Sequence, residues 1–336
     1  MLNFENKANR YSENNTATQA DAALTAIAKS APSISSSALL VNVIIRHWSA
    51  QAGDKQVAEQ AEHLHGADKG TVKATKSLLG KMPEIVAIKA FTKMVRDWHN
   101  SQSMPWVDKG PRLVTTARFL SGYQTQLTEF KNTFENDLVP AFLEAYAWRR
   151  GEYMIKQGSM AKDSDFPPIE EVATKFGFSI SEDIIAESGD WRLDINRDAL
   201  QVMVERNSKL MQERVTAAVH SVWERAHKAL THMSERLDYE DTGETEEYTA
   251  ASGRSMTRRV GVKKFQDTLV EHVNHIVDIM NTCNITNDPT MQMAQLKLTN
   301  AMRGVTPDAL RENNTLREDT KKAVDAVIAL LPDLNF

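Results

Sequence analysis

The stretch that decides the fold is Asn196–Leu237, NRDALQVMVERNSKLMQERVTAAVHSVWERAHKALTHMSERL. It contains neither Pro nor Gly, and its apolar residues recur every three or four positions, the period of an amphipathic α-helix. Asn196 is a suitable N-cap. We therefore predict one long helix over about 196–237. Its apolar stripe consists of Leu200, Val204, Met211, Val215, Ala218, Val222, Ala229, Met233 and Leu237.

A second long helix is predicted upstream, from Gly110-Pro111 to about residue 157. The apolar spacing in this segment is close to a heptad seam. Pro140 lies in its middle and is expected to kink it, because proline cannot donate the helical hydrogen bond. The stripe consists of Phe119, Tyr123, Leu127, Phe130, Phe134, Leu138, Ala141, Ala145 and Trp148.

The sequence predicts a mainly α, elongated protein in which these two helices pack on each other as a helical hairpin or coiled coil. An antiparallel packing is favoured, but the connector 158–195 is long enough for a parallel one. A minor β element is predicted at Leu39–Trp48, which is β-branched and apolar, with a buried helix as the close competitor. Shorter helices are predicted at about 54–65, 70–80, 83–102, 169–176, 264–283, 288–302, 306–312 and 316–331.

The expected organisation follows the chain from one end to the other. We predict a flexible tail with a short helix over 1–35 and a small helical domain with one possible strand over 36–110. The long-helix hairpin follows over 111–240, with 158–195 as its connector. A charged loop over 241–263 and a C-terminal helical subdomain over 264–336 complete the chain.

Composition and charge narrow the function classes. The net charge is −5, whereas affinity for nucleic acid comes largely from neutralising phosphates with basic residues. Cys283 is the only cysteine, which excludes an intramolecular disulfide and a cysteine-based zinc site. Met1–Ser30 does not resemble a signal peptide, and the longest apolar run, Ala38–Ile45, is too short to span a bilayer. We expect a cytoplasmic protein.

No catalytic motif stands out. The chain has neither a GxxxxGK[ST] loop nor a GxGxxG loop, so we predict no cofactor, and an enzyme is not favoured. His272 and His275 stand three apart on a predicted helix and are weak metal candidates, as are His220 and His227. Neither pair has an obvious third ligand, so an ordinary helix surface explains them better. Cys283 is interpreted as a buried structural thiol.

One segment could hold a polyanion. The acidic run 238–248 is followed by a basic run with interspersed glycines, and we interpret 238–264 as a loop. Pairing of the two runs into a self-neutralising surface hairpin is the favoured interpretation, and binding of single-stranded nucleic acid is the alternative. Base stacking is a minor option for Trp106 and Trp191, whereas Trp98, Trp148 and Trp223 are interpreted as core. The candidate phosphate-binding residues are Arg254, Arg258, Arg259, Lys263 and Lys264.

Several segments together resemble a known family. Trp98–Leu113, WHNSQSMPWVDKGPRL, is similar to a PWxDxGxRL signature found in an uncharacterised family of early proteins of tailed bacteriophages and prophages. The resemblance extends over about residues 40–332. It implies a phage protein that acts in the bacterial host cytoplasm, near DNA replication and recombination genes, and it brings no activity with it. The other matching segments are Lys76–Leu79, Phe166-Pro167, Phe176–Phe178, the GDWRLD run at 189–194, the VWERAH run at 222–227 with its continuation to Leu237, and Ile285–Pro289.

Two functions follow as hypotheses. The first is a non-enzymatic helical interaction protein that forms homo-oligomers or binds a phage or host protein through its long helices, because such long apolar stripes exceed what one helix pair can bury. The second is a single-stranded nucleic-acid binding or annealing accessory protein that uses the basic segment 254–264. No membrane partner is expected. The segment 238–264 is longer here than in the resembling family, which argues against a family-wide basic site.

Overall fold

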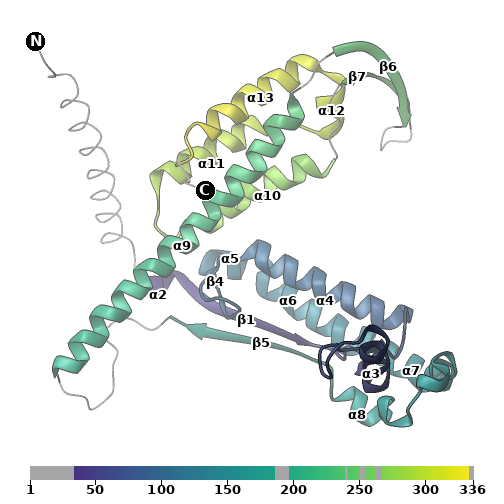
Figure 1. Cartoon of the computed structure of the whole chain (residues 1–336). Coiled ribbons are helices and arrows are strands. Elements are labelled where there is room, and N and C mark those ends of the chain that lie inside the picture. Colours follow the sequence, from purple (N-terminus) through teal and green to yellow (C-terminus); the bar gives the residue numbers. More distant parts are fainter. Residues whose placement is uncertain (1–33, 186–196, 239–240, 250–253, 262–266, 333–336) are drawn as a thin grey trace, which may run out of the picture. The chain divides into compact units, whose positions relative to one another are not determined.

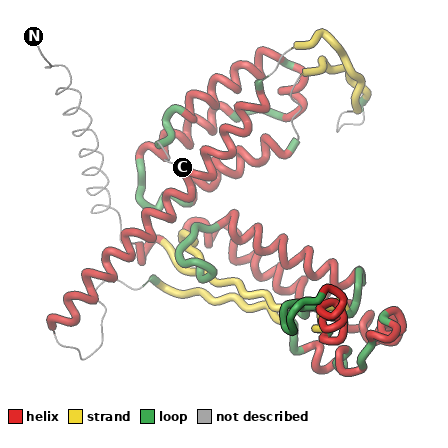
Figure 2. The backbone as a smooth tube through the Cα atoms, viewed as in Figure 1, coloured by secondary structure: helices red, strands yellow, loops and turns green. Residues whose placement is uncertain are grey.

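A computed structural model describes residues 34–185, 197–238, 241–249, 254–261 and 267–332 (Figures 1 and 2). The structure is mostly helical (67%), as predicted, and it also contains small antiparallel sheets. The described residues fall into two compact units that interleave along the chain. Unit 1 combines the residues up to Leu40 with Gln102–Phe119 and Asp183 onward, and unit 2 combines Val41–Ser101 with Leu120–Glu182.

Unit 1 is built around the second half of α9 (Arg197–Leu237). From Ala218 to Leu237 the predicted stripe is buried except for Ala229, which is partly buried, and Trp223 and Leu230 lie in the same core. The helices α10 (Thr268–Thr282) and α13 (Asn314–Ile328) pack directly on α9, and α11 (Pro289–Ala301) packs on both of them (Figure 1). The short helix α12 (Pro307–Glu312) leads into α13.

Local sequence signals set the ends of these helices. Asp288 accepts from the Thr290 amide and is followed by Pro289, which suits the first helical position. Thr306 caps α12 and Asn313 caps α13 in the same way. The helices predicted at about 264–283, 288–302, 306–312 and 316–331 are therefore confirmed, with small differences at their ends.

Within Gln102–Phe119 the chain folds back on itself through a turn at 107–110. Met104 and Leu113 exchange backbone hydrogen bonds of 2.9 Å in both directions and are fully buried. Strand β4 (Arg112–Thr115) follows, and Thr115 caps α5 (Thr116–Arg118) by accepting from the Arg118 amide. The chain in unit 1 also includes α2 (Ile34–Ser37).

Unit 2 has an aromatic core between helices and strands. Strands β1 (Ala38–Arg46) and β5 (Gly177–Ile184) are neighbours in a three-stranded sheet ordered β4-β1-β5. The helix α4 (Pro83–Gln102) runs beside α6 (Gln124–Asn132) along these strands (Figure 1). Ring contacts continue through the core, from Trp98 against Phe130 (5.2 Å) and Phe91 against Phe134 (6.5 Å) to Phe142 against Tyr146 (6.0 Å). The strand at Leu39–Trp48 and the helices at 54–65, 83–102 and 169–176 are confirmed.

The remaining elements of unit 2 are short. Strands β2 (Gln51–Gly53) and β3 (Thr75–Ser77) pair antiparallel on either side of α3 (Lys55–His65). Two 3-10 turns, η3 (Gly158–Met160) and η4 (Asp163–Asp165), lead to α8 (Ile169–Ala173).

The first long helix spans Thr116–Lys156 in pieces of different geometry. The π segment η1 (Phe119–Tyr123) contains a break at Ser121 and Gly122, whose φ is 103°, and this break was not predicted. A second π segment, η2 (Thr133–Leu138), directly precedes Pro140 and leads into α7 (Val139–Lys156). A π turn accommodates one extra residue and is a recognised place for a proline-related irregularity.

The extra residue changes which face of α7 is buried. The predicted stripe continued through Ala141, Ala145 and Trp148. The structure buries Phe142 and Tyr146 instead, each one position later, while Ala141 is exposed and Trp148 is 83% exposed. The prediction that Trp148 lies in the core is therefore wrong, because a uniform 3.6-residue period does not hold across the π turn.

Three other predictions are also wrong. The segment 70–80 is not a helix: Gly70 and Gly80 have positive φ values of 92° and 52°, and β3 lies between them. The first long helix begins at Thr116, since β4 occupies the residues after Pro111. The segment 238–264 contains the paired strands β6 (Asp241–Thr249) and β7 (Ser255–Gly261), so it is a hairpin and not an irregular loop.

The two long helices bury their apolar residues in different clusters. The α9 stripe lies in the unit 1 core with α10 and α13, and the α6 and α7 stripes lie in the unit 2 core with α4. These are long helices, as predicted, but a coiled coil between them is not shown. The predicted tail and helix within 1–33, the N-cap Asn196 and the GDWRLD run lie outside the described residues. None of the helices in the described ranges has the length and apolar character needed to cross a membrane.

Unit 2 contains a buried ion cluster whose removal gives a testable prediction for the stability of the fold. The Lys76 ammonium lies 2.7 Å from Asp165 and 3.7 Å from Asp54, and it also donates to the Met160 carbonyl. Replacing Lys76 with Met would leave two carboxylates in a poorly solvated site without their cation. We expect a loss of about 3–5 kcal/mol in the free energy of unfolding, measured by urea denaturation.

The matched control is Lys93→Met, which breaks an exposed pair with Asp97. Exposed pairs contribute little, so this variant is expected to unfold like the parent protein. Equal urea midpoints for the two variants would contradict a stabilising role of the buried Lys76 ion cluster.

Candidate functional site

Segments that carry the family resemblance meet inside unit 1. Trp106 of the PWVDKGPRL segment is buried, and the Arg214 guanidinium of α9 lies 5.7 Å from its ring centre. Arg225 of the VWERAH run donates to the Ser103 carbonyl at 2.7 Å. Arg112 donates to the Ser103 hydroxyl at 2.7 Å. These contacts tie the segment Ser103–Arg112 to α9, so Trp106 is a core residue and is not available for base stacking.

Arg225 is the central group of this arrangement. Its guanidinium also donates to the Ser221 carbonyl at 3.2 Å. Burial lowers the pKa of Arg225, but arginine stays charged at neutral pH. A buried cation that donates to backbone carbonyls of two segments is a structural tie between them, and its chemistry requires no external ligand.

A second polar group lies on α10. Arg118 and Asp278 form an ion pair of 2.5 Å, and the Thr115 hydroxyl donates to the Thr282 carbonyl at 2.6 Å. Both contacts fasten the start of the first long helix to α10. His275 lies within 3.5 Å of the Gln102 amide nitrogen.

The environment of His275 favours its neutral form. Burial lowers its pKa, and the positive charges of Arg118 and Arg225 and the neighbouring His272 lower it further, while Asp278 acts in the opposite direction. Cys283 is 3% exposed, as predicted, and burial raises the pKa of its thiol despite the two nearby arginines. A protonated, buried thiol is a poor nucleophile.

The metal candidates are placed as follows. His272 is exposed and His275 is half-buried on the same helix. His220 lies 3.4 Å from Glu224 on the exposed side of α9. Among the residues that the structure describes, no three His, Cys, Asp or Glu side chains come together in a way that could hold a metal ion.

The basic segment lies in the hairpin of β6 and β7. In the backbone register Arg258 stands opposite Glu246, and Arg259 stands opposite Thr245. Arg254 precedes β7 and is exposed, whereas Lys263 and Lys264 lie outside the described residues. The register places an acidic strand beside a basic one, in agreement with the self-neutralising hairpin. Nucleic-acid binding by this segment stays a prediction.

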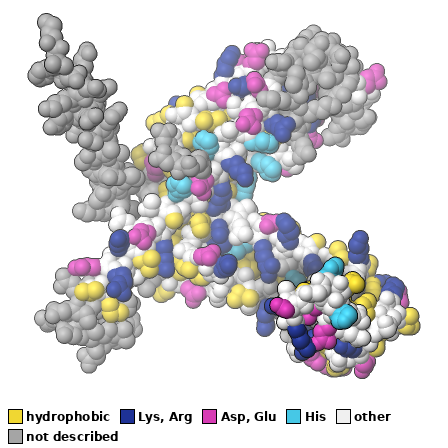
Figure 3. Space-filling model, viewed as in Figure 1, with side chains coloured by type: hydrophobic (Ala, Val, Ile, Leu, Met, Phe, Trp, Pro, Cys, Tyr) yellow, Lys and Arg dark blue, Asp and Glu magenta, His cyan; other side chains and the backbone are white. Residues whose placement is uncertain are grey.

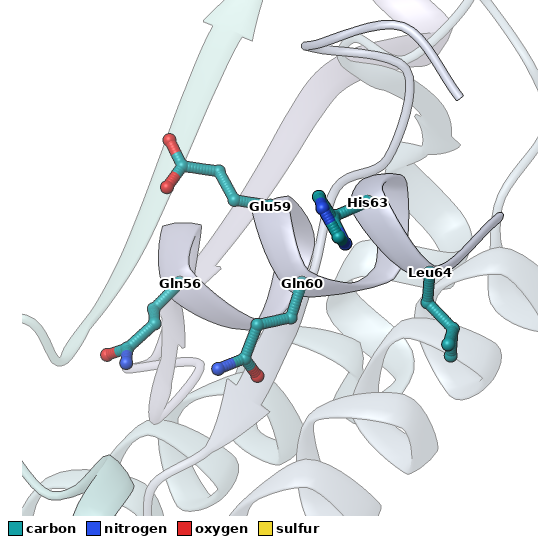
Figure 4. A pocket seen from close by; sticks show the side chains of 5 residues that line it. All are labelled: Gln56, Glu59, Gln60, His63 and Leu64. Carbon is teal, nitrogen blue, oxygen red and sulfur yellow. The ribbon is translucent and has the colours of Figure 1, made fainter. Parts of the chain in front are cut away.

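A shallow depression on α3 is a further concave feature. It is lined by Gln56, Glu59, Gln60, His63 and Leu64, whose side chains point in different directions (Figure 4). All five come from one helix and are exposed. Ligand sites usually bring polar groups from several elements together, so this depression is an uneven helix surface.

Large apolar side chains are exposed on both long helices. On α7, Trp148 is 83% and Ile155 is 82% exposed, and on α9, Val202 is 55% and Leu210 is 40% exposed. Hydrophobic, basic and acidic side chains are interspersed over the first half of α9 (Figure 3). The sequence predicted more apolar surface on the long helices than one helix pair can bury. It did not single out Ile155, and it placed Trp148 in the core.

No match to this chain is found among models of protein families, among curated proteins or among solved structures. The resemblance to the phage family therefore stays a prediction. The features that point to function are the exposed apolar faces of α7 and α9.

The environment of His275 predicts a pH dependence of stability. A histidine pKa that is lowered in the folded state means that the unfolded chain binds more protons. The contribution of neutral His275 to the free energy of unfolding is complete above the unfolded pKa of about 6.5. It is lost as the pH falls below that value, with a slope of at most about 1.4 kcal/mol per pH unit. His275→Gln should flatten this slope in urea titrations between pH 7 and 5. An unaltered slope in His275→Gln would count against this assignment.

The hairpin register predicts weak binding of nucleic acid by the unmodified chain. Replacing Glu244, Glu246 and Glu247 with Gln removes three negative charges from the acidic strand. We expect this variant to retain a fluorescent single-stranded oligonucleotide at low salt and to release it as salt is raised. Equally strong binding by the unmodified chain, lost when Arg254, Arg258 and Arg259 become Ala, would instead support the nucleic-acid hypothesis.

Proposed function

We propose that this chain is a non-enzymatic helical interaction protein whose docking surface is the exposed face of α7. The resemblance supports a place in the bacterial host cytoplasm, alongside phage DNA replication and recombination. The observation that carries the proposal is the exposure of Trp148 and Ile155.

Trp148 and Ile155 stand seven residues apart and therefore lie on one face of α7, two turns from each other. Phe142 and Tyr146 fill the opposite face, which is buried. Tryptophan is enriched among the residues that dominate binding energy at protein interfaces, because it buries a large rigid surface. An exposed Trp with an exposed Ile on the same face favours a docking surface over an ordinary solvated helix.

The charges on this face indicate the kind of partner. Glu144 and Glu152 stand four residues before and after Trp148, and both are exposed. Glu152 pairs with Lys156 at 2.5 Å, which lowers the pKa of the Glu152 carboxyl. A second copy of the same face would bring carboxylates towards carboxylates. We therefore expect another protein, whose contact segment combines apolar side chains with Lys or Arg.

The buried polar groups of unit 1 have a structural role and do not indicate a second functional site. Arg225, Arg118 and Thr115 each hold one segment of the fold against another.

Photo-crosslinking tests the docking surface. A benzoylphenylalanine placed at Trp148 should form a discrete adduct with a host or phage protein in producing cells. The adduct should weaken at least several-fold when Ile155 is changed to Ser, and also when Glu144 and Glu152 are changed to Lys. Circular dichroism melting confirms that each variant is folded.

The matched control is the same photoreactive residue at Lys93, an exposed position on α4 of the same unit. The absence of any discrete adduct at position 148, or an equal pattern from position 93, would contradict the proposal.

A further inference from the structure

The exposed face of α7 contains a glycine in the interior of the helix. Gly151 lies between Trp148 and Ile155 along the chain and is exposed, as they are. Glycine makes a helix interior less stable than alanine does, because it loses more backbone freedom on folding. Two features of the chain itself can require a glycine: an unusual backbone conformation, or a neighbour that leaves no room for a Cβ.

Neither feature is present at Gly151. Gly122 has a φ of 103°, and at Gly177 a Cβ would lie 2.9 Å from the Arg46 guanidinium, so these two glycines have a reason within the fold. Gly151 has no positive φ, and a Cβ added to it would meet no neighbouring side chain within 4 Å. An alanine would therefore fit at this position without strain and would stabilise the helix.

The residues around Gly151 have the spacing of a site for a second helix. In knobs-into-holes packing, an inserted side chain is surrounded by four residues of the facing helix, at i, i+3, i+4 and i+7. The exposed face of α7 has this set at Trp148, Gly151, Glu152 and Ile155. Trp148 and Ile155 form apolar walls at the two ends of the set. The position of Gly151 has no side chain, so an inserted group can reach the helix backbone there.

We propose that the partner docks an α-helix on α7 and places one large apolar side chain, such as leucine or phenylalanine, over Gly151 between Trp148 and Ile155. The glycine lowers the stability of the free chain, and the close contact that it permits stabilises the complex. This inference rests on the proposed function, which makes this face the docking surface, and it specifies the docking segment of the partner.

The charges beside the hole set a second requirement on the partner helix. Glu144 lies one turn before Trp148 on the same face. Glu152 borders the hole and pairs with Lys156 at 2.5 Å, and the Lys156 ammonium also lies 4.8 Å from the Tyr153 ring centre. We therefore expect a Lys or Arg about one turn from the inserted apolar side chain, where it can pair with Glu144.

Other occupants of this face make the opposite demand on position 151. A lipid surface, or an extended segment lying across Trp148 and Ile155, gains apolar contact when a larger apolar side chain replaces Gly151. A helix whose side chain fills the hole is displaced by the same replacement. The dependence of binding on the size of residue 151 therefore separates a docked helix from a flat apolar contact.

A size series at position 151 tests the inference, with the adduct formed by the photoreactive residue at position 148 as the readout. Gly151→Ala should raise the melting temperature by about 2–4 °C and still reduce the adduct. Gly151→Leu should reduce the adduct at least several-fold. Both replacements favour the helix, so unfolding cannot explain a lost adduct. The control is Ala90→Leu, which adds bulk at an exposed position of α4 and should leave the adduct unchanged.

Three results would overturn the inference. An adduct that is unchanged or stronger in Gly151→Leu would indicate a flat apolar contact. A lower melting temperature in Gly151→Ala would show that the chain itself requires the glycine. The crosslinked partner peptide, sequenced by mass spectrometry, should have apolar residues three and four apart with a nearby Lys or Arg. Apolar residues at every second position would indicate an extended segment instead.

Failure of this inference is distinguishable from failure of the proposed function. The proposed function fails when position 148 gives no discrete adduct. The inference alone fails when an adduct is formed and depends on Ile155 but not on the size of residue 151.

Discussion

The π turn before Pro140 decides what the first long helix offers to the outside. Proline has no amide hydrogen, and the segment Thr133–Leu138 widens by one residue just ahead of it. The face that enters the core therefore moves from the Trp148 line to the line of Phe142 and Tyr146. Trp148 and Ile155 face solvent as a consequence of this change of phase. Because of this π turn, the part of the stripe that the sequence predicts for the core at Trp148 lies on the surface instead.

A different constraint acts on α9. Its apolar stripe is continuous, but the helices that cover it reach only as far as Ala218 and its neighbours. In the first half of α9, Val202 and Leu210 are exposed, whereas Met203, Val204 and Asn207 are half-buried. Both long helices therefore carry more apolar surface than their own unit buries, for different physical reasons.

Sequence periodicity predicted most elements of this fold. Long amphipathic segments with clear caps, such as those starting at Pro289 and Asn314, were predicted to within three residues at each end. Periodicity failed where the backbone departs from a uniform helix: the break at Gly122, the π turn and the glycine-bounded stretch around Lys76. The acidic and basic runs at 238–264 predicted the self-neutralising hairpin, although they contain few apolar residues to indicate strands. No local signal could reveal the ties from Arg225 to Ser103 or from Arg118 to Asp278, because these join segments far apart in the chain.

The central claim is that Trp148 is a surface residue, and fluorine NMR of the chain labelled with 5-fluorotryptophan tests it directly. The Trp148 resonance is assigned from its loss in Trp148→Phe, and Trp223, which is 4% exposed, serves as the buried reference. On changing from H2O to D2O, the account predicts a solvent-isotope shift at Trp148 close to that of free fluorotryptophan, and almost none at Trp223. A Trp148 resonance that is as insensitive to solvent as Trp223 would contradict the account.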